Sequence, residues 1–472
     1  MLHIRKKFLS LLLFGTLVSA SAFSNIEGLA AARYMPRVTK EMTDPAFWGK
    51  AASDPDQLLA DASVIPQINA RILQEKDCMM TDLLNVPAVF DGEKLKANLT
   101  EAAEKELMDF ADGSYYDEAG AVLTSDFTAP VLANISGMEG GSSRSVAYGI
   151  CTTRADVRAF PSLRIVTETQ GDIDCDEWQL SALRVGEPVI VKSVSADRHY
   201  YYLTSDCISG WVYAGHIALC RSRNEWLGAW NIPSSQAYVV TADRFRLEQS
   251  STNPDVSETL LTMGTVLKKA SDAEAAQQIE NRLSYNSYAA WLPVRRNDGY
   301  YARKLVLIPE NRGVSEGYLP LTVNNIVSTA FELLGDTYGW GSGLSSADCS
   351  SYMRDVYHCF GLNLPRNTSW QAAMPTYKVT WEKDAPVESK KAVLNTLLPG
   401  AILLFSGHEM MYLGHIGDTY YVISALGSIR DFNSEEKLRV RGVVINTLDV
   451  KRMSGHTWIE DIHTATVPYR LP

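Results

Sequence analysis

The segment YGWGSGLSSADCSSYMRDVYHCFG, residues 338–361, gives the clearest indication of the fold. A glycine-rich loop leads into Asp348, a residue type that is preferred at helix N-caps. Beyond it, apolar residues recur at intervals of three and four, which predicts one buried helix face: Tyr352, Met353, Val356, Tyr357 and Phe360. Gly361 suits the end of such a helix. The segment therefore predicts a helix whose first turn carries Cys349.

The position of Cys349 favours a nucleophile. Unpaired backbone N–H groups and the positive end of the helix dipole stabilise a thiolate and lower the pKa of the thiol. We therefore expect Cys349 to have a lowered pKa and to be the thiol that is alkylated first. Cys359 lies near the other end of the same helix and has no such help.

A cysteine nucleophile needs a base that can also protonate the leaving amine. His408 lies in GAILLFSGHEMMYLG, residues 400–414, at the start of a strand that follows another predicted strand at 401–405. Alternation along the strand places His408 and Glu409 on opposite faces. A histidine at the head of an otherwise apolar strand predicts a functional role, whereas His415 falls in GHIGD, a predicted turn.

Three other kinds of site are excluded by the same residues. HEMMY is not HExxH, because Tyr412 stands where the second zinc ligand would be. GWGSG is not followed by the GK[ST] of a P-loop, and no GxSxG elbow is present. We expect no metal and no organic cofactor.

The combination of these motifs resembles the NlpC family of cell-wall cysteine peptidases. The resemblance covers residues 321–448 and rests on YGWGSG, on DCSS at a helix start, on LPRNTSWQ at 364–371 and on GHEMMYLG. It implies a papain-like α+β domain over residues 320–472, with Cys349 as nucleophile and His408 as base.

The resemblance also assigns supporting residues. Asp348 and Ser350, on either side of the cysteine, match positions that bind substrate, and Tyr338 matches an aromatic residue of the same pocket. Ser424 in YYVISALG matches the third catalytic position, where relatives often carry histidine. A hydroxyl can accept the imidazole N–H but holds the ring less firmly.

Each of these residues also has a purely structural interpretation. Asp348 could be only a helix cap and Tyr338 only part of the core, while Ser424 could be an ordinary strand residue. Arg366 in LPRN is either a surface charge or a structural ion-pair partner.

The upstream sequence predicts three further units. Residues 33–140 are mostly helical, most clearly at 97–110, and a glycine-serine break at 137–143 follows. Short β-type segments then form two sets, at 144–225 and 232–312, each of a length that suits a small barrel. The first set resembles bacterial SH3-like domains in RADVRAFPS (154–162) and YYYLTSDCISGWV (200–212), and the second resembles them less closely. The fold class is α+β.

The first residues predict export. A basic start at Arg5–Lys7, an apolar stretch over 8–18 and a small-residue site ending at Ala22 are typical of a signal peptide spanning 1–22. No later segment is long and apolar enough to span a membrane. We expect a periplasmic or secreted protein, without a membrane anchor after cleavage and monomeric.

Charge and cysteine content narrow the possible partners and crosslinks. A net charge of −11 gives no basic surface for nucleic acid. In an oxidising compartment six of the seven cysteines could pair, or they could be small buried residues. The six candidates for pairing are Cys78, Cys151, Cys175, Cys207, Cys220 and Cys359.

What the resemblance implies about function is hydrolysis of peptidoglycan stem peptides between γ-D-glutamyl and the diamino acid, with peptidoglycan or muropeptides as partners. Two alternatives stay open. One is a wall-binding protein whose peptidase domain has lost activity, with Ser424 as its first sign. The other is an acyltransferase or amidase that uses the same Cys–His pair.

Overall fold

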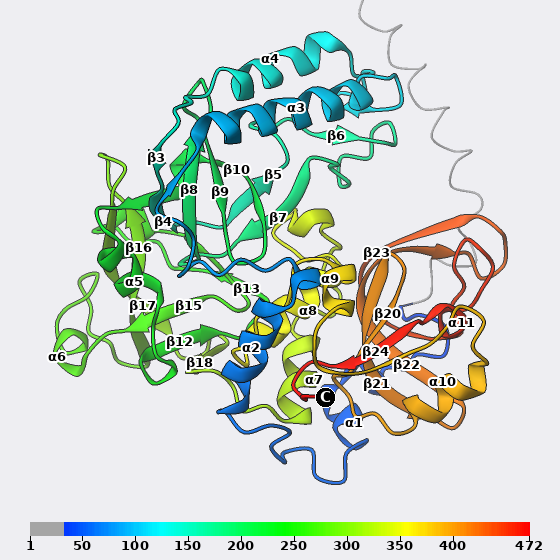
Figure 1. Ribbon diagram of the computed structural model, residues 1–472. Coiled ribbons are helices and arrows are strands. Elements are labelled where there is room, and N and C mark those ends of the chain that lie inside the picture. Colours follow the sequence, from blue (N-terminus) through cyan, green and yellow to red (C-terminus); the bar gives the residue numbers. More distant parts are fainter. Residues whose placement is uncertain (1–32) are drawn as a thin grey trace, which may run out of the picture.

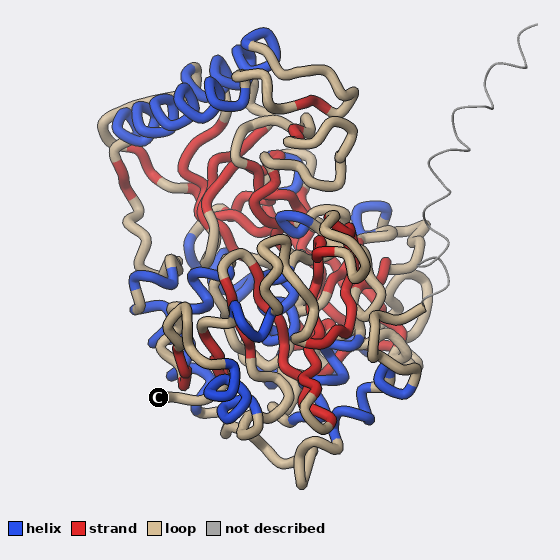
Figure 2. Tube along the Cα trace, turned by 90° about the vertical axis from the view of Figure 1, so that its right-hand side faces the viewer, coloured by secondary structure: helices blue, strands red, loops and turns tan. Residues whose placement is uncertain are grey.

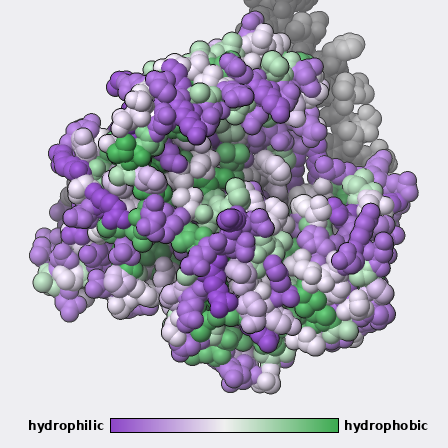
Figure 3. All heavy atoms as spheres, viewed as in Figure 1, coloured by the Kyte–Doolittle hydropathy of each residue, from purple (hydrophilic) through white to green (hydrophobic). Residues whose placement is uncertain are grey.

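The computed structural model describes residues 33–472 and forms an elongated molecule with α3 and α4 at one end and the C-terminal sheet towards the other (Figure 1). The predicted signal peptide, residues 1–22, lies outside the described residues. Within residues 33–472, no helix combines the length and the apolar character needed to cross a membrane. On the face shown in Figure 3, apolar residues form small areas within a largely hydrophilic surface.

The N-terminal helices divide between two hydrophobic cores. The helices are α1 (Pro45–Gly49), α2 (Val64–Gln74), α3 (Gly92–Phe110) and α4 (Ser125–Ser136). Trp48 of α1 and Ile68 of α2 are buried in the core of the C-terminal domain. Leu107 of α3 and Val131 of α4 instead pack on the first β unit, and Figure 2 again shows these two helices above its strands. The helical region is therefore shared by two parts of the molecule.

Helix α3 begins five residues before the predicted segment 97–110. Its N-cap is Asp91, whose side chain accepts a hydrogen bond from the Lys94 backbone N–H at 3.0 Å. This bond satisfies one of the free N–H groups of the first turn. The short polar run before residue 97 is therefore helical because it is capped, although it contributes little apolar surface.

The first β unit is a seven-stranded antiparallel sheet in the order β11-β4-β8-β9-β10-β5-β7. Its strands are β4 (Ala147–Cys151), β5 (Ala155–Arg158), β7 (Gln179–Leu183), β8 (Pro188–Val194), β9 (Tyr200–Thr204), β10 (Ser209–Tyr213) and β11 (Ile217–Cys220). Val157, Leu203 and Val212 are fully buried between its strands. Two-residue strands pair at its edge, β1 (Val89–Phe90) with β3 (Arg144–Ser145) and β2 (Tyr116–Asp117) with β6 (Val166–Thr167). Helix α5 (Arg223–Trp230) follows the unit.

The second β unit is smaller. Its five-stranded antiparallel sheet has the order β17-β16-β15-β12-β18. The strands are β12 (Ala237–Val240), β15 (Val266–Lys269), β16 (Ser287–Arg295), β17 (Tyr301–Pro309) and β18 (Val314–Glu316). The pair β13 (Arg244–Arg246) and β14 (Leu260–Thr262) and helix α6 (Asp272–Ala275) complete the unit. Leu261, Leu292 and Ile308 lie in its core.

The C-terminal domain packs helices on a six-stranded antiparallel sheet, ordered β19-β24-β20-β21-β22-β23. Its strands are β19 (Tyr377–Thr380), β20 (Ile402–Phe405), β21 (His408–Ile416), β22 (Thr419–Arg430), β23 (Lys437–Thr447) and β24 (Thr464–Val467). Its helices are α7 (Val323–Phe331), α8 (Cys349–His358), α9 (Thr368–Ala372), α10 (Val387–Leu394) and α11 (Trp458–Asp461). Helix α8 packs across β21 and β22. His415 belongs to β21, not to the predicted turn.

Buried ion pairs connect the first β unit to helix α8. Arg184, at 2% exposure, is bonded to Glu187 of its own unit and to Asp355 of α8, and its Nε donates to the Met263 carbonyl at 3.0 Å. Arg354 of α8 reaches back to Asp206 at 3.2 Å. Because burying unpaired charges is costly, these pairs fix how α8 sits against the β units.

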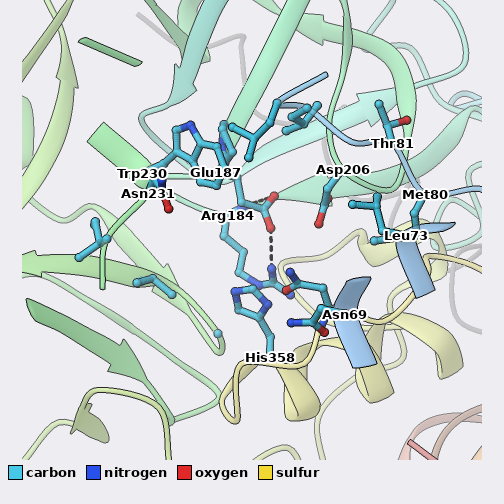
Figure 4. A pocket seen from close by; sticks show the side chains of 18 of the residues that line it. Asn69, Leu73, Met80, Thr81, Arg184, Glu187, Asp206, Trp230, Asn231 and His358 are labelled. Atoms are coloured by element: carbon cyan, nitrogen blue, oxygen red, sulfur yellow. Dashed lines mark hydrogen bonds and ion pairs between the residues drawn. The ribbon is translucent and has the colours of Figure 1, made fainter. Parts of the chain in front are cut away.

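A cavity of about 360 Å³ lies at this junction (Figure 4). The cavity is lined by Leu73 and Met80 of the N-terminal region, Trp230 at the end of α5 and His358 of α8. It contains neither Cys349 nor His408.

Candidate active site

The start of helix α8 has the cap predicted from the sequence. Asp348 is the N-cap, and its side chain accepts a hydrogen bond from the Ser351 backbone N–H at 2.9 Å. The Ser351 hydroxyl accepts in return from the Asp348 backbone N–H at 2.9 Å. These reciprocal bonds fix Cys349 as the first residue of the helix.

The thiol of Cys349 is buried, with 8% of the residue exposed. Its sulfur contacts the Thr368 hydroxyl of α9 at 3.7 Å and accepts a hydrogen bond from the backbone N–H of Glu409. The sulfur therefore lies beside the first residues of β21, next in sequence to His408.

Burial raises the pKa of Cys349 to about 12, and the nearby negative charge of Asp348 acts in the same direction. The expectation of a lowered pKa was therefore wrong for this structure. Loss of hydration around the sulfur outweighs the stabilisation that a helix start provides. In the resting protein Cys349 is a neutral thiol that must lose its proton during attack.

The imidazole of His408 is held by one hydrogen bond and two aromatic rings. Its Nε2 lies 3.1 Å from the Ser424 hydroxyl of β22. Its ring packs against Phe405 and Trp458, with ring centroids at 5.5 and 5.0 Å. The bond to Ser424 occupies Nε2 and leaves Nδ1 as the other ring nitrogen. Among the described residues, no hydrogen bond joins His408 to Cys349 directly.

Burial, together with the charge of Arg452, lowers the pKa of His408 to about 3. The imidazole is therefore neutral at physiological pH and free to accept a proton. A neutral thiol and a neutral imidazole are the starting states for general-base catalysis, in which proton transfer accompanies attack.

We expect peptidase activity to persist well below pH 6.5, because a base with a pKa of about 3 stays unprotonated there. The pKa of His408 is lower in the folded protein than in the unfolded chain. Between pH 6.5 and pH 3 the unfolded chain therefore binds more protons at His408 than the folded protein does. Folding stability decreases as the pH falls through that range. Measuring kcat/KM against pH, with circular dichroism at each pH, separates loss of the base from unfolding. A decline in kcat/KM centred near pH 6.5 in folded protein would contradict the low pKa.

Ser424 occupies the place that the resemblance gave to the third catalytic group. It is fully buried and its hydroxyl reaches the imidazole Nε2. The contact agrees with an orienting role.

Replacing Ser424 with alanine should lower turnover about fivefold, since a neutral hydrogen bond contributes ~1 kcal/mol. Turnover of a defined peptide by the native protein and by Ser424→Ala measures the effect. His415→Ala is the matched control, because His415 is exposed at the far end of β21. An unchanged rate in Ser424→Ala with a loss in His415→Ala would show that the third group lies elsewhere.

Asp348 and Ser350 were predicted to bind substrate, but both are buried and bonded to Arg366. The guanidinium of Arg366, at 2% exposure, donates to Asp348 Oδ2 at 2.6 Å and to the Ser350 hydroxyl at 2.9 Å. Its Nε donates to the Ser181 hydroxyl of the first β unit at 2.8 Å. Of the two interpretations of Arg366, the structure selects the structural ion-pair partner.

A groove of about 730 Å³ opens over the imidazole of His408. Its walls come from two parts of the chain. Tyr338, Trp340 and the turn between Phe405 and His408 belong to the C-terminal domain, and the loop residues 168–177 belong to the first β unit. Tyr338, predicted to line a substrate pocket, is therefore at the groove, and the β unit forms one of its sides.

The glycine-rich loop before Cys349 is held by the first β unit. Arg154 donates to the carbonyls of Ser342 and Ser346 at 2.5 and 3.0 Å. Gly341 has φ +59°, and a Cβ there would lie 2.3 Å from the Gln179 carbonyl oxygen. Glycine is needed at this point because two backbones approach closely in a left-handed conformation.

The seven cysteines are all unpaired. Six are buried, which agrees with the interpretation as small core residues. Cys175 is only half-buried; it lies in the groove, 3.6 Å from the Arg441 guanidinium.

We expect iodoacetamide to modify Cys175 before Cys349, the reverse of the order predicted from the sequence. Cys175 is the more accessible thiol, and burial holds the pKa of Cys349 at about 12. A time course mapped by mass spectrometry gives the order, and the fully buried Cys359 is the control. Faster labelling of Cys349 than of Cys175 at mildly acidic pH would show that the pKa of the Cys349 thiol is lowered, as the sequence predicts.

Comparisons with known proteins agree on the class of protein. Residues 335–464 match the model of the NlpC/P60 family, and residues 164–213 match that of an SH3 domain of the SH3b1 type. The C-terminal domain is therefore an NlpC/P60 domain preceded by an SH3b domain, which confirms the α+β organisation expected from the sequence. NlpC/P60 proteins are generally cell-wall peptidases, and membership implies a cysteine peptidase.

One solved structure shares this fold over most of its length. An NlpC/P60 endopeptidase from Photobacterium damselae subsp. piscicida superposes with a TM-score of 0.71 at 17% identity, over 90% of this chain and 97% of that one. An NlpC/P60 family protein from Bacillus cereus ATCC 10987 gives a TM-score of 0.43 at 14% identity, over 69% of this chain and 100% of that one. No curated protein matches the sequence.

Sequence reasoning missed two of the contacts around the nucleophile. Thr368 lies in LPRNTSWQ, residues 364–371, so this motif contained a residue of the site that could have been identified. Glu409 was placed on the face of the strand away from His408, and nothing in the sequence indicated that it is buried beside Cys349. Within residues 33–472, no three His, Cys, Asp or Glu side chains are grouped as metal ligands would be.

Proposed function

We propose that the protein is an exported cysteine endopeptidase that hydrolyses peptidoglycan stem peptides between γ-D-glutamyl and the diamino acid. The observation that carries the proposal is the site itself: a capped helix-start Cys349 beside a strand that begins with an oriented, neutral His408. The NlpC/P60 match and the predicted signal peptide at 1–22 support the substrate class and the export.

The reaction is acyl transfer in two steps. His408 removes the proton from the Cys349 thiol as the sulfur attacks the amide carbonyl, and the backbone N–H of Cys349 helps to stabilise the oxyanion. The imidazolium then protonates the leaving amine, and a thioester remains. Water, deprotonated by the same imidazole, hydrolyses the thioester and restores the thiol.

The groove supports a short substrate with a free amino end. Its wall from the SH3b domain carries the carboxylates of Glu168, Asp172 and Glu177. Arg441 is already bonded to Asp172, whereas Glu168 forms no ion pair among the described residues. Carboxylates at one end of a groove favour a cationic amine there, so we propose that the free L-Ala amine of the stem peptide lies against this wall.

Defined peptides test the proposal. L-Ala-γ-D-Glu linked to lysine or diaminopimelate is incubated with the native protein and with Cys349→Ala, and the products are identified by mass spectrometry. We expect release of L-Ala-γ-D-Glu by the native protein only, and slower release when the L-Ala amine is acetylated.

The same assay distinguishes the alternatives. Binding to purified sacculi without cleavage of any peptide would indicate a wall-binding protein. Products joined to an added amine would indicate an acyltransferase. Release of the stem peptide from the sugar of a muropeptide, assayed in parallel, would indicate an amidase. Cleavage that persists in Cys349→Ala would overturn the cysteine mechanism.

A further inference from the structure

Glu409 is a buried carboxyl group that the reaction described above does not use. It follows His408 in β21, none of its surface is exposed, and neither carboxyl oxygen has a hydrogen-bond partner. The residue paired with it on β20 is Leu404, which is also fully buried. A carboxyl group without partners in such a place is rare, because a buried polar group usually finds one.

The nucleophile is close to this carboxyl. The backbone N–H of Glu409 donates to the Cys349 sulfur, and an ionised Glu409 side chain would oppose ionisation of the thiol. β21 packs against α8, which carries both Asp348 and Cys349. The buried wall behind the sulfur therefore contains a second ionisable group.

Two charged groups act on Glu409, and neither forms an ion pair with its carboxyl group. They are Asp348 of α8 and Arg366, from the loop before α9. Arg366 points its guanidinium nitrogens at Asp348, Ser350 and Ser181, and none at Glu409. On β21 itself the neighbouring titratable group is His408, which is neutral.

An isolated carboxylate in an apolar environment is far more costly than the neutral acid. Burial, and then the negative charge of Asp348, raise the pKa of Glu409 well above its ordinary value. An ionised Glu409 would place a second negative charge beside a sulfur that becomes negative during attack. The two charges oppose each other, so ionisation of one group disfavours ionisation of the other.

We propose that Glu409 is held as the neutral acid in the buried wall next to Cys349, and that its ionisation opposes formation of the thiolate. The inference concerns the chemistry of the thiol and rests on the proposed function only in taking Cys349 as the nucleophile. The neutral acid allows the thiolate to form during attack, and its ionisation limits that step on the alkaline side.

The test measures the thiol directly, without turnover. Labelling of Cys349 by iodoacetamide is followed against pH by peptide mapping, in the native protein and in Glu409→Gln, which resembles the neutral acid in shape. We expect similar labelling near neutral pH and a midpoint about one pKa unit lower in the variant, hence ~tenfold faster labelling on the alkaline side. Glu388→Gln, with its side chain 82% exposed, is the matched control and should label as the native protein does.

A second variant and a spectroscopic measurement keep the test decisive. Glu409→Met removes the carboxyl with an apolar side chain of similar length and should shift the midpoint in the same direction. Infrared spectra at neutral pH should show the carbonyl band of a protonated carboxylic acid that Glu409→Gln lacks. Identical pH profiles in the native protein and both variants, or the absence of that band, would overturn the proposal. Because labelling needs no substrate, this result is independent of whether the stem peptide is cleaved.

Discussion

Replacing His408 with alanine is expected to lower kcat/KM on a stem peptide by roughly 10²–10⁴-fold, the usual contribution of a positioned general base. The effect is large because the pKa of Cys349, about 12, leaves almost no thiolate without a base. Cys349→Ala should abolish turnover altogether, since no thioester can form. Both are measured by product release from the defined peptide.

A matched control guards against a general loss of structure. His199→Ala removes a histidine of the first β unit that does not line the groove and whose side chain is 69% exposed. We expect its turnover to stay close to native. If His408→Ala retained native activity while folded, another residue would have to be the base.

Replacing Arg366 with leucine is expected to be the most destabilising single change considered, at about 3–5 kcal/mol, because it leaves the Asp348 carboxylate buried and unpaired. Asp348 then keeps only its helix-cap bonds and the bond from the Ser350 hydroxyl, and Ser181 and Ser350 lose a donor. Denaturant midpoints followed by tryptophan fluorescence measure the change.

An exposed ion pair provides the comparison. Arg37→Leu removes the partner of Asp449 from a pair whose side chains are 62% and 53% exposed, so it should cost at most ~1 kcal/mol. Combining Arg366→Leu with Asp348→Asn should recover part of the stability, since the unpaired charge is then absent. Equal denaturation midpoints for Arg366→Leu and Arg37→Leu would show that the buried ion pair contributes no more to folding stability than the exposed one.

Local patterns predicted much of the fold. The capped helix at Cys349 and the hairpin that carries His408 follow from short sequence intervals, namely a cap residue, three- and four-residue spacing, and alternation. Helix Cys349–His358 and the start of the strand at His408 agree with the prediction, whereas the strand continues through the predicted turn to Ile416. Helix starts and strands are determined largely by nearby residues, and a single sequence contains that information.

Other properties of the site depend on packing between distant segments. The raised pKa of Cys349 results from desolvation by α9 and β21, and the bonds of Asp348 and Ser350 to Arg366 join residues 16 to 18 positions apart. The burial of Glu409 depends on a helix packed over its strand. No local pattern encodes these contacts, and the substrate-binding roles of the residues flanking the cysteine remain predictions.

The bonds from Arg154 to the Ser342 and Ser346 carbonyls have a consequence for how this chain can change during evolution. An accessory module joined only by a linker can be exchanged, duplicated or lost without harm to its neighbour. Here the loop that precedes the nucleophile takes its shape from another module, so recombination at the boundary would separate the loop from its support. The SH3b and NlpC/P60 domains of this chain are therefore expected to be inherited as one unit, each constraining substitutions in the other.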